Sequence, residues 1–138
     1  MRKSVEFYPF QVKSNGDCLY LAVRKSLKMS GALSVLEMRH SVAMEVMTHG
    51  PEYQQRFRAF LTAEGRDLKT YVQGILEGEW GDQLEMWALG RMLRVSIKVL
   101  HCSSLQWVDV RKEEGVPTVF LVYGDALQHY TVAGNVAG

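Results

Sequence analysis

One short segment of the chain places a cysteine directly behind a polar turn and directly in front of an apolar helical pattern. Residues 14–17, Ser-Asn-Gly-Asp, favour a turn, and Cys18 follows at once. The apolar residues that then repeat at helical spacing are Leu19, Ala22, Val23 and Leu27. Cys18 is therefore expected in the first turn of a helix. Backbone amides and the helix dipole at that position favour the thiolate, which is the nucleophilic form of the side chain.

The polar turn ahead of Cys18 also predicts free backbone N–H groups. Such groups can bind the oxyanion that forms when a thiolate attacks a carbonyl. Gly16 would let a substrate approach the backbone closely, because it has no side chain. The alternative is that Cys18 is a small buried hydrophobe, which is the common fate of a free cysteine. The nucleophile interpretation needs a base from another part of the chain.

Four histidines are available as that base. His129 opens the segment HYTVA, and a strand end provides a rigid mount for a base at the edge of a cleft. A cysteine early in the chain and a histidine late is the order found in thiol hydrolases. His101 lies beside Cys102, but this pair lacks metal-ligand spacing, and we interpret it as structural or exposed. His40 and His49 fall within or at the end of a predicted helix.

Helices are expected first along the chain and strands last. Spacing, caps and glycine stops predict helices over residues 18–29, from 34 to a stop at 50–51, 52–63, from 67 to a break at 78, and 82–93. Strands are predicted over residues 6–12, 95–99, 106–110, 118–123 and 129–133. This order predicts one α+β domain over residues 1–138, with a mostly antiparallel sheet and a loose tail over 134–138. Trp87 and Trp107 are predicted to be core residues.

Composition narrows the class of partner. The chain has 138 residues, is 47% hydrophobic and 22% charged, and has a formal net charge of +1. This balance predicts a globular protein and gives no electrostatic basis for binding nucleic acid or an anionic membrane. We read no secretory signal or membrane span. Two cysteines favour a reducing, cytoplasmic environment, and we expect a monomer.

Three segments of the chain together resemble the ovarian-tumour (OTU) family of cysteine proteases. NGDCLYLAV, residues 15–23, is similar to the family's Asp-Gly-Asn-Cys-Leu-Phe stretch. EWGDQLEMWALGRMLRVSIKVL, residues 79–100, is similar to its Trp-Gly, Leu-Glu and Ala-Leu run into an Ile-Val strand, and HYTVA, residues 129–133, to its terminal His-Tyr segment. The resemblance implies a papain-like OTU fold in which helices pack on a small, mostly antiparallel sheet.

The resemblance also implies a chemistry, because the family consists mainly of deubiquitinases that cleave after the C-terminal glycine of ubiquitin. By position, Cys18 would be the nucleophile that forms a thioester acyl-enzyme, and His129 the general base. The implied oxyanion hole comprises Asn15, Gly16, Asp17 and Cys18. The implied substrate-binding residues are Trp80, Gly81, Asp82 and Tyr130.

Two departures from the family's pattern concern groups that support the reaction. Asn15 stands where the family has Asp, and Asp17 adjoins the cysteine, although both residues keep turn-forming chemistry. The family has Asp or Asn two residues after the histidine, where this chain has Thr131. Its hydroxyl would share a strand face with His129 and could accept the ring N–H without supplying a charge. Alternatives for this orienting role are Asn15, Asp125 and Asn135.

An acidic run lies beside the implied substrate channel and consists of Glu77, Glu79, Asp82 and Glu85. It would either attract the basic tail of ubiquitin or form a solvated helix start with acids suited to the helix dipole. The sequence leaves both interpretations open.

Together with this resemblance, the sequence predicts a thiol isopeptidase that acts on ubiquitin or polyubiquitin without metal or cofactor. Activity on other ubiquitin-like modifiers is left open. The short spacing is similar to that of the viral branch of the family, which would place the protein in host cytoplasm. One alternative is a noncatalytic or very slow ubiquitin-binding module, motivated by the residues at 15 and 131. Another is a metal site built from Cys18, Cys102, His101 and His129, which lack the paired spacing of zinc ligands.

Overall fold

The computed structural model describes residues 16–27, 34–79, 81–124 and 129–132, and in the last range only the side chain of Tyr130. The predicted strand over 6–12 and the predicted tail over 134–138 lie outside these residues. The described helices are α1 (Cys18–Ser26), α2 (Val35–Thr48), α3 (Gly50–Arg56), α4 (Arg58–Glu64), α5 (Leu68–Leu76) and α6 (Gln83–Leu93). The strands are β1 (Ser96–His101), β2 (Gln106–Arg111), β3 (Thr118–Gly124) and β4 (His129–Val132).

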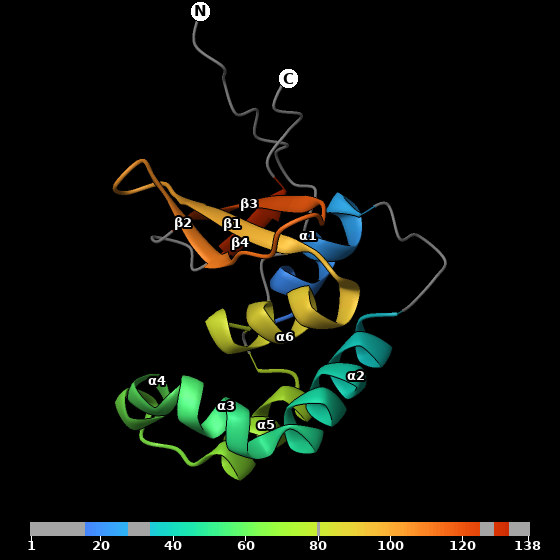
Figure 1. Ribbon diagram of the computed structural model, residues 1–138, viewed down its shortest axis with the longest axis vertical. Coiled ribbons are helices and arrows are strands. Elements are labelled where there is room, and N and C mark those ends of the chain that lie inside the picture. The colour runs from blue at the N-terminus through green and yellow to red at the C-terminus, as the bar shows by residue number, and fades with distance from the viewer. Residues whose placement is uncertain (1–15, 28–33, 80, 125–128, 133–138) are drawn as a thin grey trace, which may run out of the picture.

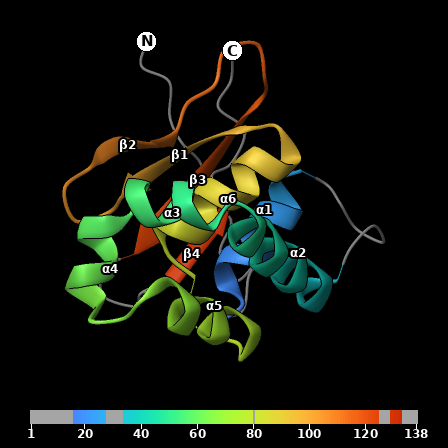
Figure 2. The ribbon, with the colours of Figure 1, turned by 60° about the horizontal axis from the view of Figure 1, so that its bottom comes forward.

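The strands form one sheet in the order β2-β1-β3-β4. Two neighbouring pairs are antiparallel, β1 with β2 and β3 with β4, whereas β1 and β3 are parallel. Helices α2 to α5 lie on the far side of α6 from the sheet, so α6 forms a central layer (Figure 1). Helix α1 packs against β3 and β4 and also contacts α2 (Figure 2). The fold class is therefore α+β, as predicted, with a mixed sheet.

Capping residues fix where the helices begin. Ser34 accepts a hydrogen bond from the backbone amide of Glu37 at 3.1 Å, and the Glu37 carboxylate accepts one from the Ser34 amide at 2.9 Å. This reciprocal arrangement is a capping box, and it begins the helix that the sequence predicted from residue 34. Asp82 and Glu85 form a second capping box at the start of α6. Asp67 caps α5 by accepting from the Thr70 amide at 2.8 Å.

Two predicted helix boundaries were wrong. Gly50-Pro51 was predicted as a stop for α2, but α3 begins at Gly50 with the proline in its first turn. Proline suits a first turn, since the N–H it lacks would have had no helical partner there. The helix predicted over residues 52–63 is divided at Phe57, whose φ and ψ of −109° and 24° separate α3 from α4.

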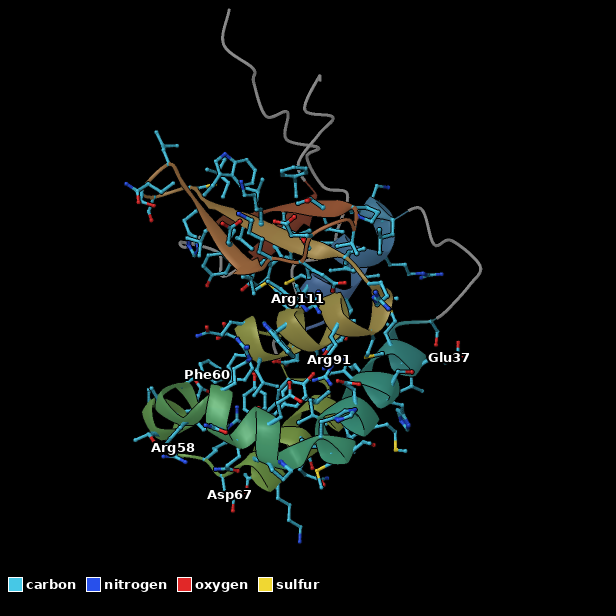
Figure 3. All side chains as sticks on the ribbon, viewed as in Figure 1. Glu37, Arg58, Phe60, Asp67, Arg91 and Arg111 are labelled. Atoms are coloured by element: carbon cyan, nitrogen blue, oxygen red, sulfur yellow. The ribbon has the colours of Figure 1, made fainter. Side chains whose placement is uncertain are left out.

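The main core lies between α6, the sheet and the surrounding helices. Trp87 of α6 is half-buried, and the guanidinium groups of Arg56, Arg91 and Arg111 lie 4.4, 5.7 and 5.3 Å from its ring centroid. Figure 3 shows Arg91 and Arg111 beside α6. The prediction that Trp107 is a core residue was wrong, because it lies on edge strand β2 and is 36% exposed. In the described part of the chain, no helix has both the length and the apolar content to cross a bilayer.

Candidate active site

Cys18 is the first residue of α1, where the sequence placed it. The backbone carbonyl of Asp17 already accepts from the Leu21 amide at 2.9 Å, so the helix begins at the turn itself. The side chain of Cys18 is fully buried at the junction of α1 with the sheet. Both interpretations of this residue therefore have support, because it has helix-terminal surroundings and is also enclosed.

Two opposing effects act on the Cys18 thiol. Burial raises its pKa, since the thiolate would lose its hydration. Backbone hydrogen bonds from Tyr130, from Leu19 and from Cys18 itself lower the pKa, because amide N–H groups stabilise the thiolate. Burial is the larger effect and the pKa is raised overall. The resting side chain is consequently a thiol, with amide donors already directed at its sulfur.

Strand β4 brings the late part of the chain to Cys18. In the β3–β4 pairing, Gly124 lies opposite His129 and Tyr123 opposite Tyr130. Helix α1, which begins at Cys18, packs against β4, which begins at His129. The side chain of His129 lies outside the described residues. The structure thus joins the two ends of the chain at the predicted site through their backbones.

The other predicted site residues fall into two groups. Asn15 and Trp80 lie outside the described residues, as does the side chain of Thr131. Asp82 is exposed and accepts a hydrogen bond from the Gln83 amide at 2.7 Å, which gives it a capping role. Tyr130 is 6% exposed, and burial raises the pKa of its hydroxyl. The substrate-binding roles of Asp82 and Tyr130 stay predictions.

Two close backbone approaches form the walls beside Cys18. A Cβ on Gly16 would collide with the carbonyl oxygen of Gly78, in the turn after α5. A Cβ on Gly81 would lie 2.6 Å from the Leu19 side chain, so the turn before α6 packs directly on α1. Glycine is required at both positions because the neighbouring groups leave no room for a side chain. Gly78 and Gly81 are thereby held against the segment that carries Cys18.

The sequence analysis did not identify Arg39, which is 2% exposed and contacts the segment that carries Cys18. Its guanidinium donates to the Asp17 carboxylate, to the Gly16 carbonyl and to the Ile75 carbonyl at 2.9, 2.6 and 2.9 Å. A signal for it existed in the sequence. Arg39 falls at helical spacing with the apolar residues Val35, Val42 and Val46, so it had to face the interior.

Glu85 corrects the interpretation of the acidic run. This residue is 1% exposed, so it belongs neither to an acidic rim that attracts the ubiquitin tail nor to a solvated helix start. The Tyr71 hydroxyl donates a hydrogen bond to its carboxylate, and the Asp82 amide donates another at 3.2 Å. Burial raises the pKa of Glu85 to about 7. Glu77, Glu79 and Asp82 are exposed, as either interpretation required.

The described residues contain no group of three or more His, Cys, Asp or Glu side chains placed to hold a metal ion. Of the residues in the alternative metal site, Cys18 is buried while Cys102 is exposed. His101 is half-buried and packs edge-on against Tyr123, with ring centroids 5.6 Å apart. The chemistry available at Cys18 is therefore that of a thiol beside backbone amides.

Residues 13–129 match the family of OTU-like cysteine proteases. This span includes Cys18, the turn over 78–81 and His129, and the chain belongs to that family. The human protein named deubiquitinase OTUD6B is 29% identical over 122 residues, which cover 82% of this chain and 40% of the human protein. The mouse protein of the same name is 31% identical over 103 residues, covering 68% of this chain and 34% of its own length.

The chain thus spans about two fifths of the length of the curated relatives it matches.

Solved OTU structures confirm the fold. An OTU domain in complex with ubiquitin superimposes with a TM-score of 0.73 at 21% identity, covering 94% of this chain and 69% of that one. The Hazara virus OTU bound to ubiquitin has a TM-score of 0.65 at 20% identity, covering 98% and 82%. The predicted papain-like OTU fold is confirmed by these likenesses.

Proposed function

We propose that this protein is a deubiquitinase, a thiol isopeptidase that hydrolyses the bond after the C-terminal glycine of ubiquitin. The observation that carries the proposal is the contact between helix α1, which begins at Cys18, and strand β4, which begins at His129. That contact brings the family's nucleophile position and its histidine position together in one site. Two further facts support ubiquitin as the partner. The relative in humans is named a deubiquitinase, and related folds were solved in complex with ubiquitin.

In the proposed reaction, His129 takes the thiol proton and the Cys18 sulfur attacks the glycyl carbonyl carbon. A C–S bond forms, and the oxyanion is held by backbone amides at the start of α1. The C–N bond then breaks as His129 gives its proton to the leaving lysine amine. Water attacks the thioester, His129 accepts a proton from it, and the C–S bond breaks. Ubiquitin leaves with a free carboxylate, and Cys18 regains its proton.

Because Cys18 is fully buried and its pKa is raised, the substrate has to expose the sulfur before the reaction can begin. In the unbound protein the sulfur is a covered thiol. We propose that entry of the ubiquitin tail opens the site locally, so that the glycyl carbonyl reaches the sulfur. The amides of Cys18 and Leu19 would then pass from stabilising sulfur to stabilising the oxyanion.

An electrophilic ubiquitin probe tests the proposal directly. A ubiquitin with a C-terminal vinyl or propargyl group should label the wild type and Cys102→Ala, adding the mass of one ubiquitin. It should not label Cys18→Ala. Labelling that survives in Cys18→Ala, or a wild type that is not labelled at all, would refute the proposal.

A noncatalytic ubiquitin-binding module is the second candidate. The observation that favours it is the enclosed, protonated state of Cys18. The same probe separates the two candidates. Reversible ubiquitin binding in calorimetry, without any covalent product, is the result expected for the module.

Thr131 is the residue we propose for orienting the imidazole, with Asn15, Asp125 and Asn135 as further candidates. Thr131 follows His129 by two residues in the sequence of β4, which is the spacing at which residues of a strand share a face. A Thr131→Asp variant should raise the turnover of diubiquitin by about tenfold or more, since a carboxylate stabilises imidazolium better than a hydroxyl does. A panel of diubiquitin linkages read by gel would report this change together with the linkage preference. Unchanged turnover across the panel would remove Thr131 from the mechanism.

A further inference from the structure

The carboxyl of Glu85 is buried in the first turn of α6. It accepts hydrogen bonds from the Tyr71 hydroxyl of α5 and from the Asp82 amide, the latter at 3.2 Å. Glu37 has the equivalent position in the capping box of α2, and there the side chain is exposed. Glutamine serves in a capping box as glutamate does, and burying a carboxyl is costly. Capping therefore does not by itself account for an acid at position 85.

The titratable and charged groups around Glu85 come from each neighbouring element, either directly or through a tyrosine ring. They are Tyr20 of α1, Arg39 of α2, Arg66 before α5, Tyr71 of α5, Asp82 before α6 and Tyr130 of β4. The two guanidinium groups stack on the rings of Tyr20 and Tyr71 and pair with other carboxylates. In the part of the chain that the structure describes, no lysine or arginine forms an ion pair with Glu85.

The segment Gly81-Asp82 links this carboxyl to the start of α1. Its Asp82 amide is held by Glu85, and Asp82 itself is exposed. On its other side the segment packs on α1, because a Cβ on Gly81 would lie 2.6 Å from the side chain of Leu19. Leu19 directly follows Cys18, whose side chain is fully buried. The hydrogen bond to Glu85 thus holds backbone that packs beside the sulfur.

We propose that Glu85 is a positioning residue whose carboxyl holds Gly81-Asp82 against α1 and thereby controls access to Cys18. The inference deepens the proposed function and rests on it for the role of the sulfur. A protonated carboxyl is neutral and stays buried, so the segment remains packed on Leu19. An ionised carboxyl gains hydration by reaching water, and the movement that hydrates it takes Gly81-Asp82 away from α1.

The direction of the pH dependence follows from proton binding in the two arrangements. Burial raises the pKa of Glu85 to about 7 in the closed arrangement, from an ordinary value of 4.5 to which a hydrated carboxyl returns. The closed arrangement therefore binds the proton more tightly than the open one. Opening becomes more favourable as pH rises above about 4.5 and levels off above about 7. Access to Cys18 should increase over that range of pH.

Reaction of the unbound protein with dithiodipyridine, a disulfide that modifies thiols at acidic and neutral pH, tests the inference. Peptide mass spectrometry over a time course gives separate rates for Cys18 and Cys102. A cysteine thiol ordinarily ionises at about pH 8.5, so thiolate formation changes both rates alike below pH 8, and their ratio reports the opening. In the wild type the ratio of the Cys18 rate to the Cys102 rate should rise about 20-fold between pH 5.5 and 7.5. In Glu85→Gln it should stay constant within about twofold, because glutamine accepts the same hydrogen bonds without ionising.

Two further variants sharpen the assignment to Glu85. Glu37→Gln is the matched control, since Glu37 has the same position in an exposed capping box, and it should retain the wild-type rise. Tyr71→Phe removes a hydrogen bond that lowers the pKa of Glu85, so the rise should continue to a pH about one unit higher. A rise that persists in Glu85→Gln would assign the titration to another group, such as His129, and overturn the inference. A wild-type ratio that does not change with pH would overturn it too.

Low urea separates a local opening from unfolding of the whole domain. Unfolding exposes far more surface than a local movement, so only unfolding is strongly promoted by about 1 M urea. The ratio should change by less than about twofold in that urea concentration, and a several-fold increase would overturn the inference.

The outcomes also separate this inference from the proposed function, because the modification experiment uses no ubiquitin. A wild type that the ubiquitin probe does not label refutes the proposed function, and with it the role of this access in catalysis. A wild type that the probe labels, with a ratio that does not depend on Glu85, refutes the inference alone.

Discussion

The two cysteines of this chain lie in contrasting regions of the molecule. Cys18 is fully buried at the start of α1, among backbone amides and above the buried side chain of Arg39. Cys102 is exposed at the end of β1, beside the turn that leads to edge strand β2. Its own amide donates to the Tyr123 carbonyl at 3.0 Å. One sulfur is surrounded by directed donors, whereas the other faces solvent.

The contrast extends to the surroundings of each cysteine. Near Cys18 the structure buries ionisable groups, Arg39 and Glu85, and partners each with hydrogen bonds. Near Cys102 the turn exposes apolar side chains, with Leu105 at 77% and Val108 at 44%. Burying charge is costly unless the group is paired and hydrogen-bonded, whereas an exposed turn tolerates many residues. The comparison therefore locates the demanding chemistry at Cys18.

Replacing each sulfur by oxygen should give the largest difference. Cys18→Ser should reduce hydrolysis of a ubiquitin substrate by at least about 1,000-fold, because serine is a far weaker nucleophile at neutral pH without a strong base. Cys102→Ser should leave kcat/KM within about twofold of wild type. Comparable losses in the two variants would remove the functional distinction between the regions.

The buried carboxyl of Glu85 should make the Cys18 side of the molecule sensitive to pH. Its pKa is raised by burial to about 7, from an ordinary value of 4.5. The folded state therefore binds the proton more tightly than the unfolded state does. The resulting stability is fully present below about pH 4.5 and is lost as pH rises toward 7, by about 3 kcal/mol in all.

Glu85→Gln should abolish this dependence, because glutamine accepts the same hydrogen bonds from Tyr71 and Asp82 without ionising. Urea unfolding at pH 5 and pH 8 would measure it as the difference between variant and wild type. The matched control is Glu37→Gln, in the exposed capping box of α2. Hydrogen bonds from Ser34 lower the pKa of Glu37, so its smaller contribution is lost on acidification instead. A pH slope in Glu85→Gln equal to that of wild type would contradict the assignment.

In the unbound protein, Cys102 should be alkylated faster than Cys18, although Cys18 is the sulfur proposed to act in catalysis. Iodoacetamide should modify Cys102 at least about 100-fold faster than Cys18, because the buried thiol reacts only when the structure opens locally. Peptide mass spectrometry over a time course would give both rates. Labelling of the alkylated protein by the electrophilic ubiquitin probe checks that Cys18 remains competent. Equal rates in the unbound protein would show that Cys18 is not enclosed in solution.

Much of this arrangement could be predicted from sequence, because short-range signals carried it. The capping box at Ser34 needs only residues three apart and marked where α2 begins, and apolar spacing marked the helix predicted from residue 82. The turn that precedes Cys18 likewise placed the cysteine at the start of α1. Local chemistry fixes these features, so a single sequence displays them.

Other features depend on partners distant in the chain. Strand β1 pairs in parallel with β3 because β2 occupies the outer edge of the sheet. The alternation of residues along one strand does not indicate which strand lies beside it. The break at Phe57 lies inside an unbroken apolar pattern, since periodicity indicates which face is buried and not the backbone angle at one residue. The helical spacing of Arg39 indicates that it faces the interior, but not which groups it contacts. Its acceptors lie 22, 23 and 36 residues away along the sequence.

The Cys102 region offers the smallest and cleanest test of the comparison. Leu105 has a φ of +56°, in the left-handed region that leucine rarely adopts, and its side chain is 77% exposed. Asparagine accepts this conformation more readily, so Leu105→Asn should stabilise the protein by about 0.5–1 kcal/mol in urea unfolding. Leu36→Asn, at an exposed helical position, should instead be mildly destabilising. Because the turn lies apart from the chemistry, Leu105→Asn should leave kcat unchanged, and a loss of activity there would show that the two regions are coupled.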